Sequence, residues 1–397
     1  MGQRETTGTP ASATQETPEN CPRTAREAPE KGESMHVEVV AEQLCAPVPG
    51  GTGRYTEGLI RGLVASGQPG LDRVRLTATS DLPGVHDLGL DLRRLPVPHR
   101  VLSRLWERGL PPLVGGRDVD VVHAPTLLVP GRWRARHLAV TIHDVVPWTH
   151  PETLTPRGVA FHRRMAERAA VAADLIVTPS EAVAHEVRSR LSPRGEVAAI
   201  PPGCAFLPLP HDASARRHQV GVIAEGYVLF VGTAEPRKGL DLLVRAMAQT
   251  PGLTLVHVGP RGWGEVDVAA LAASAGISER VVLAGRVDDA TLAALYAGAA
   301  ALALPSRAEG FGLPVLEAMA AGIPVITSDD PALVEAGGGH AVVVPVGDVD
   351  ALAAGLRSVT GAGRPEASRL AAARAHAATF TWPGFGSALR AAYSMLG

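Results

Sequence analysis

Two glutamates with seven residues between them, Glu309 and Glu317, stand where a loop enters a helix. The spacing of apolar residues predicts the helix over 313–321, between an apolar strand that ends at Leu304 and a β-branched strand over 325–327. A glycine loop that enters a helix directs free backbone N–H groups at one point, which suits a phosphate, whereas carboxylates suit hydroxyl groups. The pattern therefore predicts a ligand with both phosphate and sugar; the alternative is two ordinary solvated glutamates. Gly310, Phe311 and Gly312 complete the loop, and Leu313 begins the helix.

This stretch resembles the Glu-x7-Glu signature of the retaining glycosyltransferases of family 4, which have the two-domain GT-B architecture. The resemblance covers residues 35–397 and is strongest over 226–345. It implies that Glu309 holds hydroxyl groups of a donor sugar and that Glu317 holds the ribose of its nucleotide. It also implies that residues 310–313 contact the donor.

A basic pair, Arg237 and Lys238, follows a predicted strand over 227–231. Arginine is abundant in this chain, and Lys238 and Lys31 are its only lysines. A compact ammonium group beside a planar guanidinium group suits a phosphate, although a solvated pair at a helix start is the alternative. The segment that begins at Gly232 is similar to the family's Gly-Thr…Glu-Pro-Arg-Lys segment, which implies a clamp on the donor diphosphate.

His143 directly follows a buried strand predicted over 139–142. Functional residues of open α/β sheets lie at the carboxyl ends of strands, so this position favours a role in the site. The family has a His-Asp pair at the same place, and the resemblance implies that His143 contacts the donor sugar near the reacting carbon. His123, after another predicted strand, is a weaker candidate of the same kind.

A glycine-rich segment with Gly51 and Gly53 follows the first predicted strand, over 37–44, and precedes a helix predicted over 54–65. The segment lacks the third glycine of a dinucleotide-binding motif, because Thr56 stands there. A helix-start turn without a ligand remains the alternative. In the family this loop faces the donor diphosphate, and a segment matching Arg286 and Val287 holds the nucleotide base through backbone groups.

An Asp-x-Asp pair, Asp118 and Asp120, could in principle hold a divalent metal under a sugar nucleotide. It precedes the predicted strand 121–123 and therefore lies at the amino end of the sheet, away from the functional edge. We predict no catalytic metal.

An arginine-rich stretch, with nine arginines and three acids over 93–136, includes a basic amphipathic helix near Arg104 and Arg108. It suits an anionic membrane or a phosphorylated acceptor, although an ordinary solvated face is the alternative.

The length of 397 residues fits two domains, and the net charge of −2 gives no indication of nucleic-acid binding. The three scattered cysteines predict neither a disulfide framework nor a zinc site, and no apolar run approaches the roughly 18 residues of a membrane span.

The expected fold class is α/β, with two Rossmann-like doubly wound domains facing across a cleft. The predicted segments are a disordered tail over 1–34, an acceptor-side domain over 35–215, a linker over 208–219, a nucleotide-sugar domain over 220–379, and a helix over 380–397 that returns to the first domain.

The resemblance implies a retaining, metal-independent glycosyltransferase without a cofactor, whose donor is GDP-mannose as first choice or a UDP-hexose. The acceptor is expected to be a sugar, a glycolipid or another hydroxyl compound, which places the enzyme in glycan, glycolipid or cell-envelope synthesis. The expected localisation is cytoplasmic, with contact to the inner membrane face left open. The alternatives are a nucleotide-sugar epimerase or hydrolase of the same fold, a non-catalytic nucleotide-sugar-binding protein, and an NAD-dependent oxidoreductase.

Overall fold

A computed structural model describes residues 2, 34–46, 50–67, 72–204, 207–223, 225–262, 266–361 and 365–396. The chain divides into the units Met1–Glu33 and Ser34–Gly397, and the second contains all elements discussed below. The predicted disordered tail over 1–34 lies outside the described residues, apart from residues 2 and 34.

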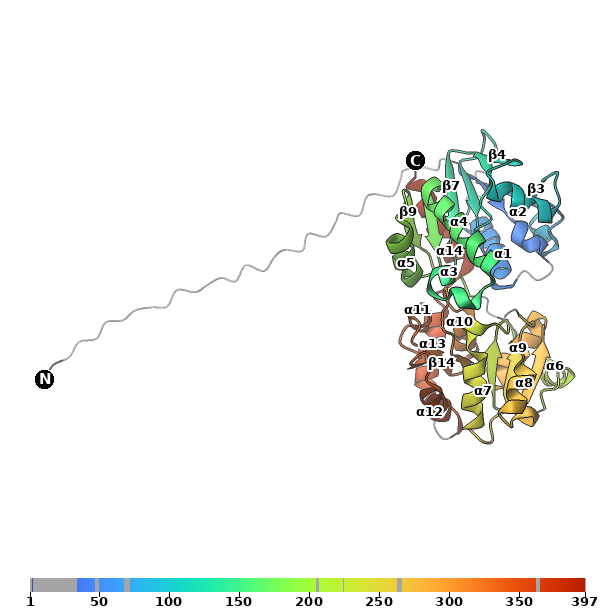
Figure 1. The fold of residues 1–397 in the computed structure, drawn as a ribbon, viewed down its shortest axis with the longest axis vertical. Helices are drawn as coiled ribbons and strands as arrows, with labels where there is room; N and C mark the ends of the chain where they lie inside the picture. Colours follow the sequence, from blue (N-terminus) through green and yellow to red (C-terminus); the bar gives the residue numbers. More distant parts are fainter. Residues whose placement is uncertain are drawn as a thin grey trace. The chain divides into compact units, whose positions relative to one another are not determined.

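The first sheet has seven parallel strands in the order β3-β2-β1-β5-β7-β8-β9 (Figure 1). The central strands are buried runs of β-branched and other apolar residues, as expected for a parallel sheet covered on both faces. The strands are β1 (His36–Val40), β2 (Arg73–Ala78), β3 (Asp91–Arg94), β5 (Val121–Ala124), β7 (His137–Thr141), β8 (Leu175–Thr178) and β9 (Glu196–Ala199). Two short strands, β4 (Leu113–Gly115) and β6 (Arg132–Arg134), pair separately.

The helices connected to this sheet cover both of its faces, and the sheet separates two hydrophobic clusters. Their starts follow ordinary capping chemistry: the Thr155 hydroxyl accepts from Gly158 N–H, and the Ser180 hydroxyl accepts from Val183 N–H. The helices are α1 (Gly50–Ser66), α2 (His99–Glu107), α3 (Val146–Thr149), α4 (Pro156–Ala172) and α5 (Glu181–Leu191).

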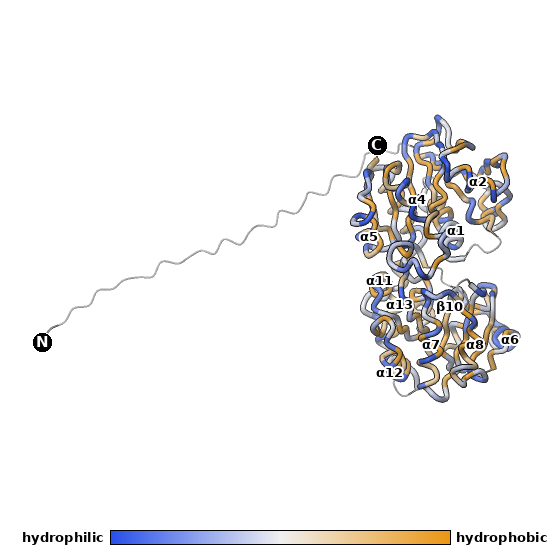
Figure 2. The backbone as a smooth tube through the Cα atoms, in the orientation of Figure 1, coloured by the Kyte–Doolittle hydropathy of each residue, from blue (hydrophilic) through white to orange (hydrophobic). Residues whose placement is uncertain are grey.

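The second sheet has six parallel strands in the order β12-β11-β10-β13-β14-β15, and it has its own hydrophobic core. Hydrophobic residues follow the interior strands of both sheets (Figure 2). The strands are β10 (Tyr227–Val231), β11 (Leu255–Val258), β12 (Val281–Gly285), β13 (Ala299–Leu304), β14 (Val325–Ser328) and β15 (Val342–Val344). The helices are α6 (Ala213–Gln219), α7 (Leu240–Ala248), α8 (Val268–Ser274), α9 (Asp289–Gly298), α10 (Leu313–Ala321), α11 (Pro331–Gly337), α12 (Val349–Val359) and α13 (Ala367–Ala377).

The last helix, α14 (Trp382–Ser394), packs on α1 of the first sheet. Glycines allow the two helices to approach closely: a Cβ on Gly62 would lie 2.4 Å from the Trp382 carbonyl oxygen, and one on Gly386 would lie 2.1 Å from the Gly62 carbonyl oxygen. Phe385 and Tyr393 of α14 then complete the hydrophobic cluster beneath α1. The C-terminal segment is therefore part of the core under the first sheet.

Four features of the structure differ from the sequence expectations. The first strand ends at Val40, because residues 42–45 form a 3-10 helix (η1), and α1 begins at Gly50 rather than at Arg54. The predicted linker over 208–219 contains α6, which packs on α9. The Ala-rich helix α13 was not predicted as an element. The two parallel α/β sheets agree with the predicted fold class.

Candidate active site

Arg237 and Lys238 lie in a 3-10 turn (η4, Pro236–Lys238) after strand β10, as the sequence predicts. The following residue, Gly239, has a φ of 70°, and a Cβ there would lie 2.1 Å from the carbonyl oxygen of Pro305. This close approach brings the loop after β10 against the loop after the neighbouring strand β13. The two loops carry the basic pair and Glu309, respectively.

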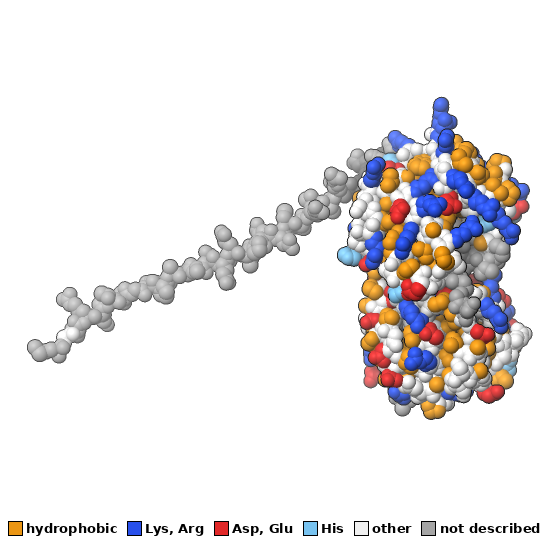
Figure 3. Space-filling view, in the orientation of Figure 1, with side chains coloured by type: hydrophobic (Ala, Val, Ile, Leu, Met, Phe, Trp, Pro, Cys, Tyr) orange, Lys and Arg blue, Asp and Glu red, His pale blue; other side chains and the backbone are white. Residues whose placement is uncertain are grey.

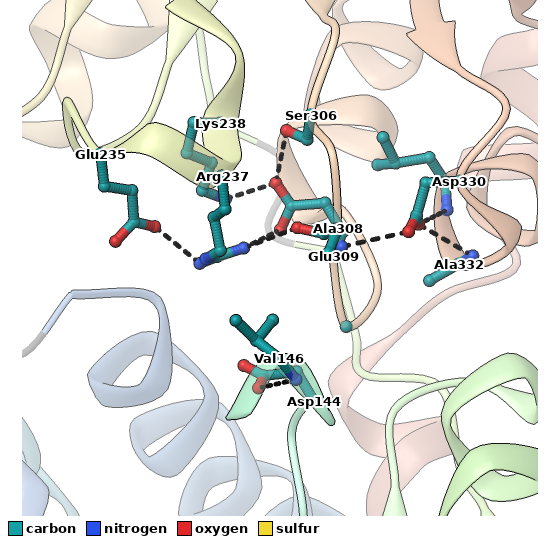
Figure 4. A network of polar contacts seen from close by, with 12 residues as sticks. Asp144, Val146, Glu235, Arg237, Lys238, Ser306, Ala308, Glu309, Asp330 and Ala332 are labelled. Carbon is teal, nitrogen blue, oxygen red and sulfur yellow. Dashed lines mark hydrogen bonds and ion pairs between the residues drawn. The ribbon is translucent and has the colours of Figure 1, made fainter. Parts of the chain in front are cut away.

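The Glu309 carboxylate accepts hydrogen bonds from both basic side chains (Figure 4). Arg237 Nη1 donates to Oε2 over 2.9 Å, Lys238 Nζ donates to Oε1 over 2.6 Å, and the Ser306 hydroxyl donates to Oε1 over 2.7 Å. Arg237 also forms an ion pair with Glu235 at 2.8 Å. All four charged side chains are largely buried, so each charge depends on its partners for solvation.

The pKa values reflect this coupling. Burial alone raises the pKa of Glu309, but the charges of Lys238 and Arg237 outweigh burial and lower that pKa to about 2. Burial and the neighbouring Arg237 lower the pKa of Lys238, while Glu309 opposes the change. Burial raises the pKa of Glu235, which Arg237 and Lys238 only partly offset. Glu309 is therefore an anion over the whole physiological range.

Asp330 supports the Glu309 loop from the neighbouring strand end. Its carboxylate accepts from Glu309 N–H at 3.3 Å, and it caps α11 by accepting from Ala332 N–H and Leu333 N–H (Figure 4). Burial is the main cause that raises the pKa of Asp330 to about 6, with the charge of Glu309 contributing. Ser328 of β14 adds a hydrogen bond to the Ser306 carbonyl at 2.6 Å. The loop is thus fixed from the end of β14, in addition to its contacts with the loop after β10.

Residues 310–313 join the two halves of the molecule. A Cβ on Gly310 would lie 1.9 Å from the His143 carbonyl oxygen, and the Ser180 hydroxyl donates to the Gly310 carbonyl at 2.9 Å. Gly312 has a φ of 105°, and Leu313 begins α10 with Pro314 in its first turn and no capping side chain among the described residues. The first N–H groups of α10 are therefore not used by a side-chain cap. Phe311 instead packs in the core near Phe380.

Glu317 lies on α10 with both carboxylate oxygens engaged. Arg54 Nη1 donates to Oε1 over 2.7 Å, and the Tyr296 hydroxyl donates to Oε2 over 2.7 Å. The second arm of the Arg54 guanidinium group lies 2.5 Å from Asp289. Arg54 belongs to α1 and Glu317 to α10, so this contact crosses from the first half of the molecule to the second.

His143 follows β7 and is fixed by two contacts. Its Nε2 lies 2.8 Å from the Pro125 carbonyl oxygen, and its ring packs edge-on against Tyr55 at 4.6 Å. Burial lowers the pKa of His143, so the ring is neutral near pH 7. Asp144 lies across from Arg237 and Glu309 (Figure 4). The His-Asp pair and the basic pair therefore approach from opposite halves.

His123, the weaker candidate, is fully buried and lies in a polar chain beneath this site. Its Nδ1 contacts the Tyr393 hydroxyl and its Nε2 lies 2.9 Å from the Thr141 hydroxyl, which in turn is 3.3 Å from the Tyr55 hydroxyl. Burial lowers the pKa of His123 to about 3. His123 connects α14 to the residues behind His143 and does not reach the site itself.

The remaining candidates are more dispersed. Gly51 and Gly53 lie in the first turns of α1 instead of a loop, and open space lies around Gly51. Gly232 directly follows β10 and forms hydrogen bonds with Val258 and His257. The exposed Arg286 and the half-buried Val287 follow β12. Their relation to a donor remains a prediction.

The Asp-x-Asp pair is part of the structural framework at the amino end of β5. Asp118 forms an ion pair with Arg75 at 3.0 Å, and Asp120 accepts from His36 N–H at 2.9 Å. Within the part of the chain that the structure describes, His, Cys, Asp and Glu side chains form no group of three or more that could hold a metal. Among the described helices, none combines the length and apolarity needed to cross a membrane.

Sequence reasoning missed Arg54, Tyr296 and Asp330. The sequence contains one signal for Arg54. A basic side chain near a helix N-terminus interacts unfavourably with the helix dipole, so no local interaction explains its presence there. Tyr296 lies inside the apolar run of α9, and Asp330 has the appearance of an ordinary N-cap, so neither pattern distinguishes them.

Two facing parallel α/β sheets with charged and glycine loops at their carboxyl ends define a GT-B type of protein, and solved structures agree. Sucrose-phosphate synthase from Thermosynechococcus elongatus matches with a TM-score of 0.68 and 21% identity, over 91% of this chain and 99% of that one. The Anabaena protein HepE in complex with UDP-glucose matches with a TM-score of 0.68 and 19% identity, over 91% of this chain and 100% of that one. At these identities the likeness concerns the fold alone.

Sequence relatives specify the family. Residues 217–375 match the model "Glycosyl transferases group 1", and residues 50–203 match "Glycosyl transferase 4-like domain". The O-antigen chain mannosyltransferase B of Escherichia coli is 32% identical over 59% of this chain, and the match spans 63% of that protein. The D-inositol 3-phosphate glycosyltransferase of Nocardia farcinica is 31% identical over 77% of this chain and 68% of its own length. The chain therefore belongs to the family 4 glycosyltransferases, as the Glu-x7-Glu stretch predicted.

Proposed function

We propose that this protein is a retaining glycosyltransferase that transfers a hexose from a nucleoside diphosphate sugar to a hydroxyl acceptor. The observation that carries the proposal is the buried cluster of Arg237, Lys238 and Glu309 at the carboxyl ends of β10 and β13. Arginine and lysine side chains at the edge of a parallel sheet, next to the start of α10 that no side chain caps, suit the binding of a diphosphate. Family membership supports the same activity.

In the proposed reaction, the bond between the anomeric carbon and the diphosphate oxygen breaks while the acceptor oxygen bonds to that carbon from the same face. The acceptor proton passes to a phosphate oxygen of the departing diphosphate, so no enzyme nucleophile is needed. Lys238 and Arg237 stabilise the negative charge that develops on the leaving group and take the place of a metal ion. Glu309 positions sugar hydroxyls, Glu317 the ribose, and neutral His143 contacts the sugar near the reacting carbon.

GDP-mannose is the proposed donor, because the segments around His143 and Arg237 are most similar to those of mannosyltransferases and a mannosyltransferase is among the relatives. A UDP-hexose is the second candidate, since HepE is a structural neighbour solved with UDP-glucose. The acceptor is proposed to be a sugar or glycolipid at the membrane surface, which the basic helix α2 could approach.

A nucleotide panel tests the proposal. Thermal shifts with GDP, UDP, ADP and NAD should show stabilisation by one of the nucleoside diphosphates and none by NAD, because only ligands that bind the folded state raise the melting temperature. Subsequent assays with the matching nucleotide sugars should show release of the nucleoside diphosphate. An epimerase would interconvert the sugar without transferring it, and a non-catalytic protein would bind the donor and leave it intact.

A further inference from the structure

The carboxylate assigned to the ribose is already occupied in this structure. Glu317 is only 5% exposed, and its two oxygens accept from Arg54 and from Tyr296. A ribose that forms hydrogen bonds with Glu317 must therefore displace one of these donors or share the carboxylate with it. Tyr296 is 2% exposed and belongs to the same hydrophobic core as Glu317's helix, so it is held in place. Arg54 is 40% exposed and comes from the opposite half of the molecule.

Arg54 also lies next to a segment that the proposed function assigns to the donor diphosphate. It follows Gly51 and Gly53 in the first turns of α1, a segment proposed to face the diphosphate. Its other partner, Asp289, is 70% exposed, and exposed ion pairs contribute little. A guanidinium group can bind two phosphate oxygens at once. A diphosphate offers such oxygens and carries more negative charge than the Asp289 carboxylate. Lys238 and Arg237 also bind a buried carboxylate, but theirs, Glu309, belongs to the same half of the molecule as they do.

We infer that Arg54 holds the ribose subsite in the donor-free protein and exchanges partners when a nucleoside diphosphate binds. In this exchange Arg54 leaves Glu317 and Asp289 for the diphosphate oxygens, and the ribose hydroxyls take its place on Glu317. Arg54 is then a donor-binding residue contributed by the first half of the molecule. This inference rests on the proposed function, because it requires a nucleoside diphosphate in the site.

The exchange predicts opposite effects on two ligands, which a single selectivity ratio measures. The ratio is the dissociation constant of the nucleoside, guanosine or uridine, divided by the dissociation constant of its diphosphate. Nucleoside binding is measured by displacement of a bound ligand, so that dissociation constants in the millimolar range can be quantified. Arg54→Gln should lower the ratio about tenfold or more, because the diphosphate loses a charged partner while the nucleoside no longer competes with Arg54 for Glu317. Glu317→Gln should raise the ratio, since the ribose loses an anionic acceptor and Arg54 is released to the diphosphate.

Arg61→Gln is the matched control. Arg61 lies on the same helix, is 38% exposed, and also pairs with two carboxylates, Glu57 and Asp87, but it does not contact Glu317. The ratio should stay at the wild-type value in this variant. A general loss of stability weakens both ligands together and leaves the ratio unchanged, so the measurement is insensitive to partial unfolding.

Two outcomes overturn the inference: an unchanged ratio in Arg54→Gln, or shifts of Arg54→Gln and Glu317→Gln in the same direction. Lys238→Ala separates this failure from failure of the proposed function. If the wild type binds GDP or UDP and Lys238→Ala weakens that binding, the proposed function stands even when Arg54→Gln has no effect. If the wild type binds no nucleoside diphosphate, both the function and the inference are wrong.

Discussion

At the scale of single residues, the site is a set of mutually dependent charges. Glu309 is bound by Lys238 and Arg237, and Arg237 is bound in turn by Glu235. None of these groups can be removed without leaving a partner uncompensated in a buried place. Variants of this cluster therefore report on the partners as well as on the residue that is changed.

The first prediction separates the phosphate clamp from the sugar contact. Glu309→Gln removes the anion that holds Lys238 and Arg237, so both cations remain available and a bare nucleoside diphosphate should bind at least as well as in the wild type. Lys238→Ala should weaken the same ligand roughly tenfold, because a charged contact is lost. Calorimetry with GDP and UDP measures both effects, and Arg245→Ala, an exposed arginine of α7, is the control. Loss of nucleotide affinity in Glu309→Gln but not in Lys238→Ala contradicts the assigned roles.

The second prediction concerns Asp330, whose pKa burial raises to about 6 from an ordinary value of 3.8. A raised pKa in the folded state means that the protonated form stabilises the fold at low pH and that this stabilisation is lost as the pH rises through about 6. Relative to Asp330→Asn, the wild type should therefore gain about 1 kcal/mol of unfolding free energy between pH 7 and pH 5. Urea unfolding at the two pH values measures the difference. A wild type that instead loses stability relative to the variant over this range shows that burial does not raise the pKa of Asp330.

The sequence identifies most charged residues of the site but not their partners. Glu309, Lys238 and His143 are found from their types and their positions after strands, because the carboxyl edge of a parallel sheet is predictable. The contact between Arg54 and Glu317 joins residues 263 positions apart on different halves. No local pattern encodes a contact across such a separation, so it requires the three-dimensional arrangement.

At the scale of elements, helices were hardest to predict where glycine or alanine dominates. Gly50, Gly51 and Gly53 favour a loop on propensity, yet α1 begins at Gly50 and includes all three, of which only Gly53 is buried. Helix α13 is rich in alanine and has few buried residues, Ala373 and Ala377, so its apolar periodicity is weak. Strands with β-branched runs, such as β7 and β10, were predicted to within a few residues.

The third prediction tests the crossing of α1 and α14. Gly62→Ala places a methyl group against the Trp382 carbonyl, which is backbone and cannot rotate away, so the helices must separate. We expect a loss of about 1–3 kcal/mol of unfolding free energy, the usual cost of overpacking. Gly51→Ala is the control, because open space surrounds it and alanine is the better helix former. Equal stability of Gly62→Ala and Gly51→Ala in chemical unfolding contradicts the close crossing.

At the scale of the whole molecule, contacts from several elements hold the two halves together. The Glu335 carboxylate of α11 accepts from the N–H groups of Glu181 and Ala182 at the start of α5, at 2.9 and 3.1 Å. Ser180 binds Gly310, and α14 returns to α1. The carboxyl edges of both sheets are therefore brought to one place. The proposed donor, which consists of a sugar and a nucleoside diphosphate, requires this arrangement.

The fourth prediction concerns the basic face of the first half. Arg100, Arg104 and Arg108 are exposed at helical spacing on and next to α2, and the exposed Val101 lies beside them. Figure 3 shows many basic side chains over this half of the molecule. Co-sedimentation with liposomes should require acidic lipid and decrease with salt, and the variant with Arg104→Gln and Arg108→Gln should bind less. Equal binding to neutral vesicles, or no binding at all, assigns these arginines to an ordinary solvated surface.

The central claim is that Lys238 and its cluster stabilise a departing nucleoside diphosphate without a metal. The most direct test is the rate at which GDP-mannose and UDP-glucose release their nucleoside diphosphate in the presence of EDTA, for the wild type and for Lys238→Ala. The wild type should turn over one of these donors, and Lys238→Ala should lower kcat roughly 10²–10³-fold with a much smaller change in KM, because the lysine acts on charge that develops in the transition state. Turnover that needs added manganese or magnesium, or a Lys238→Ala variant with wild-type kcat, would contradict the account.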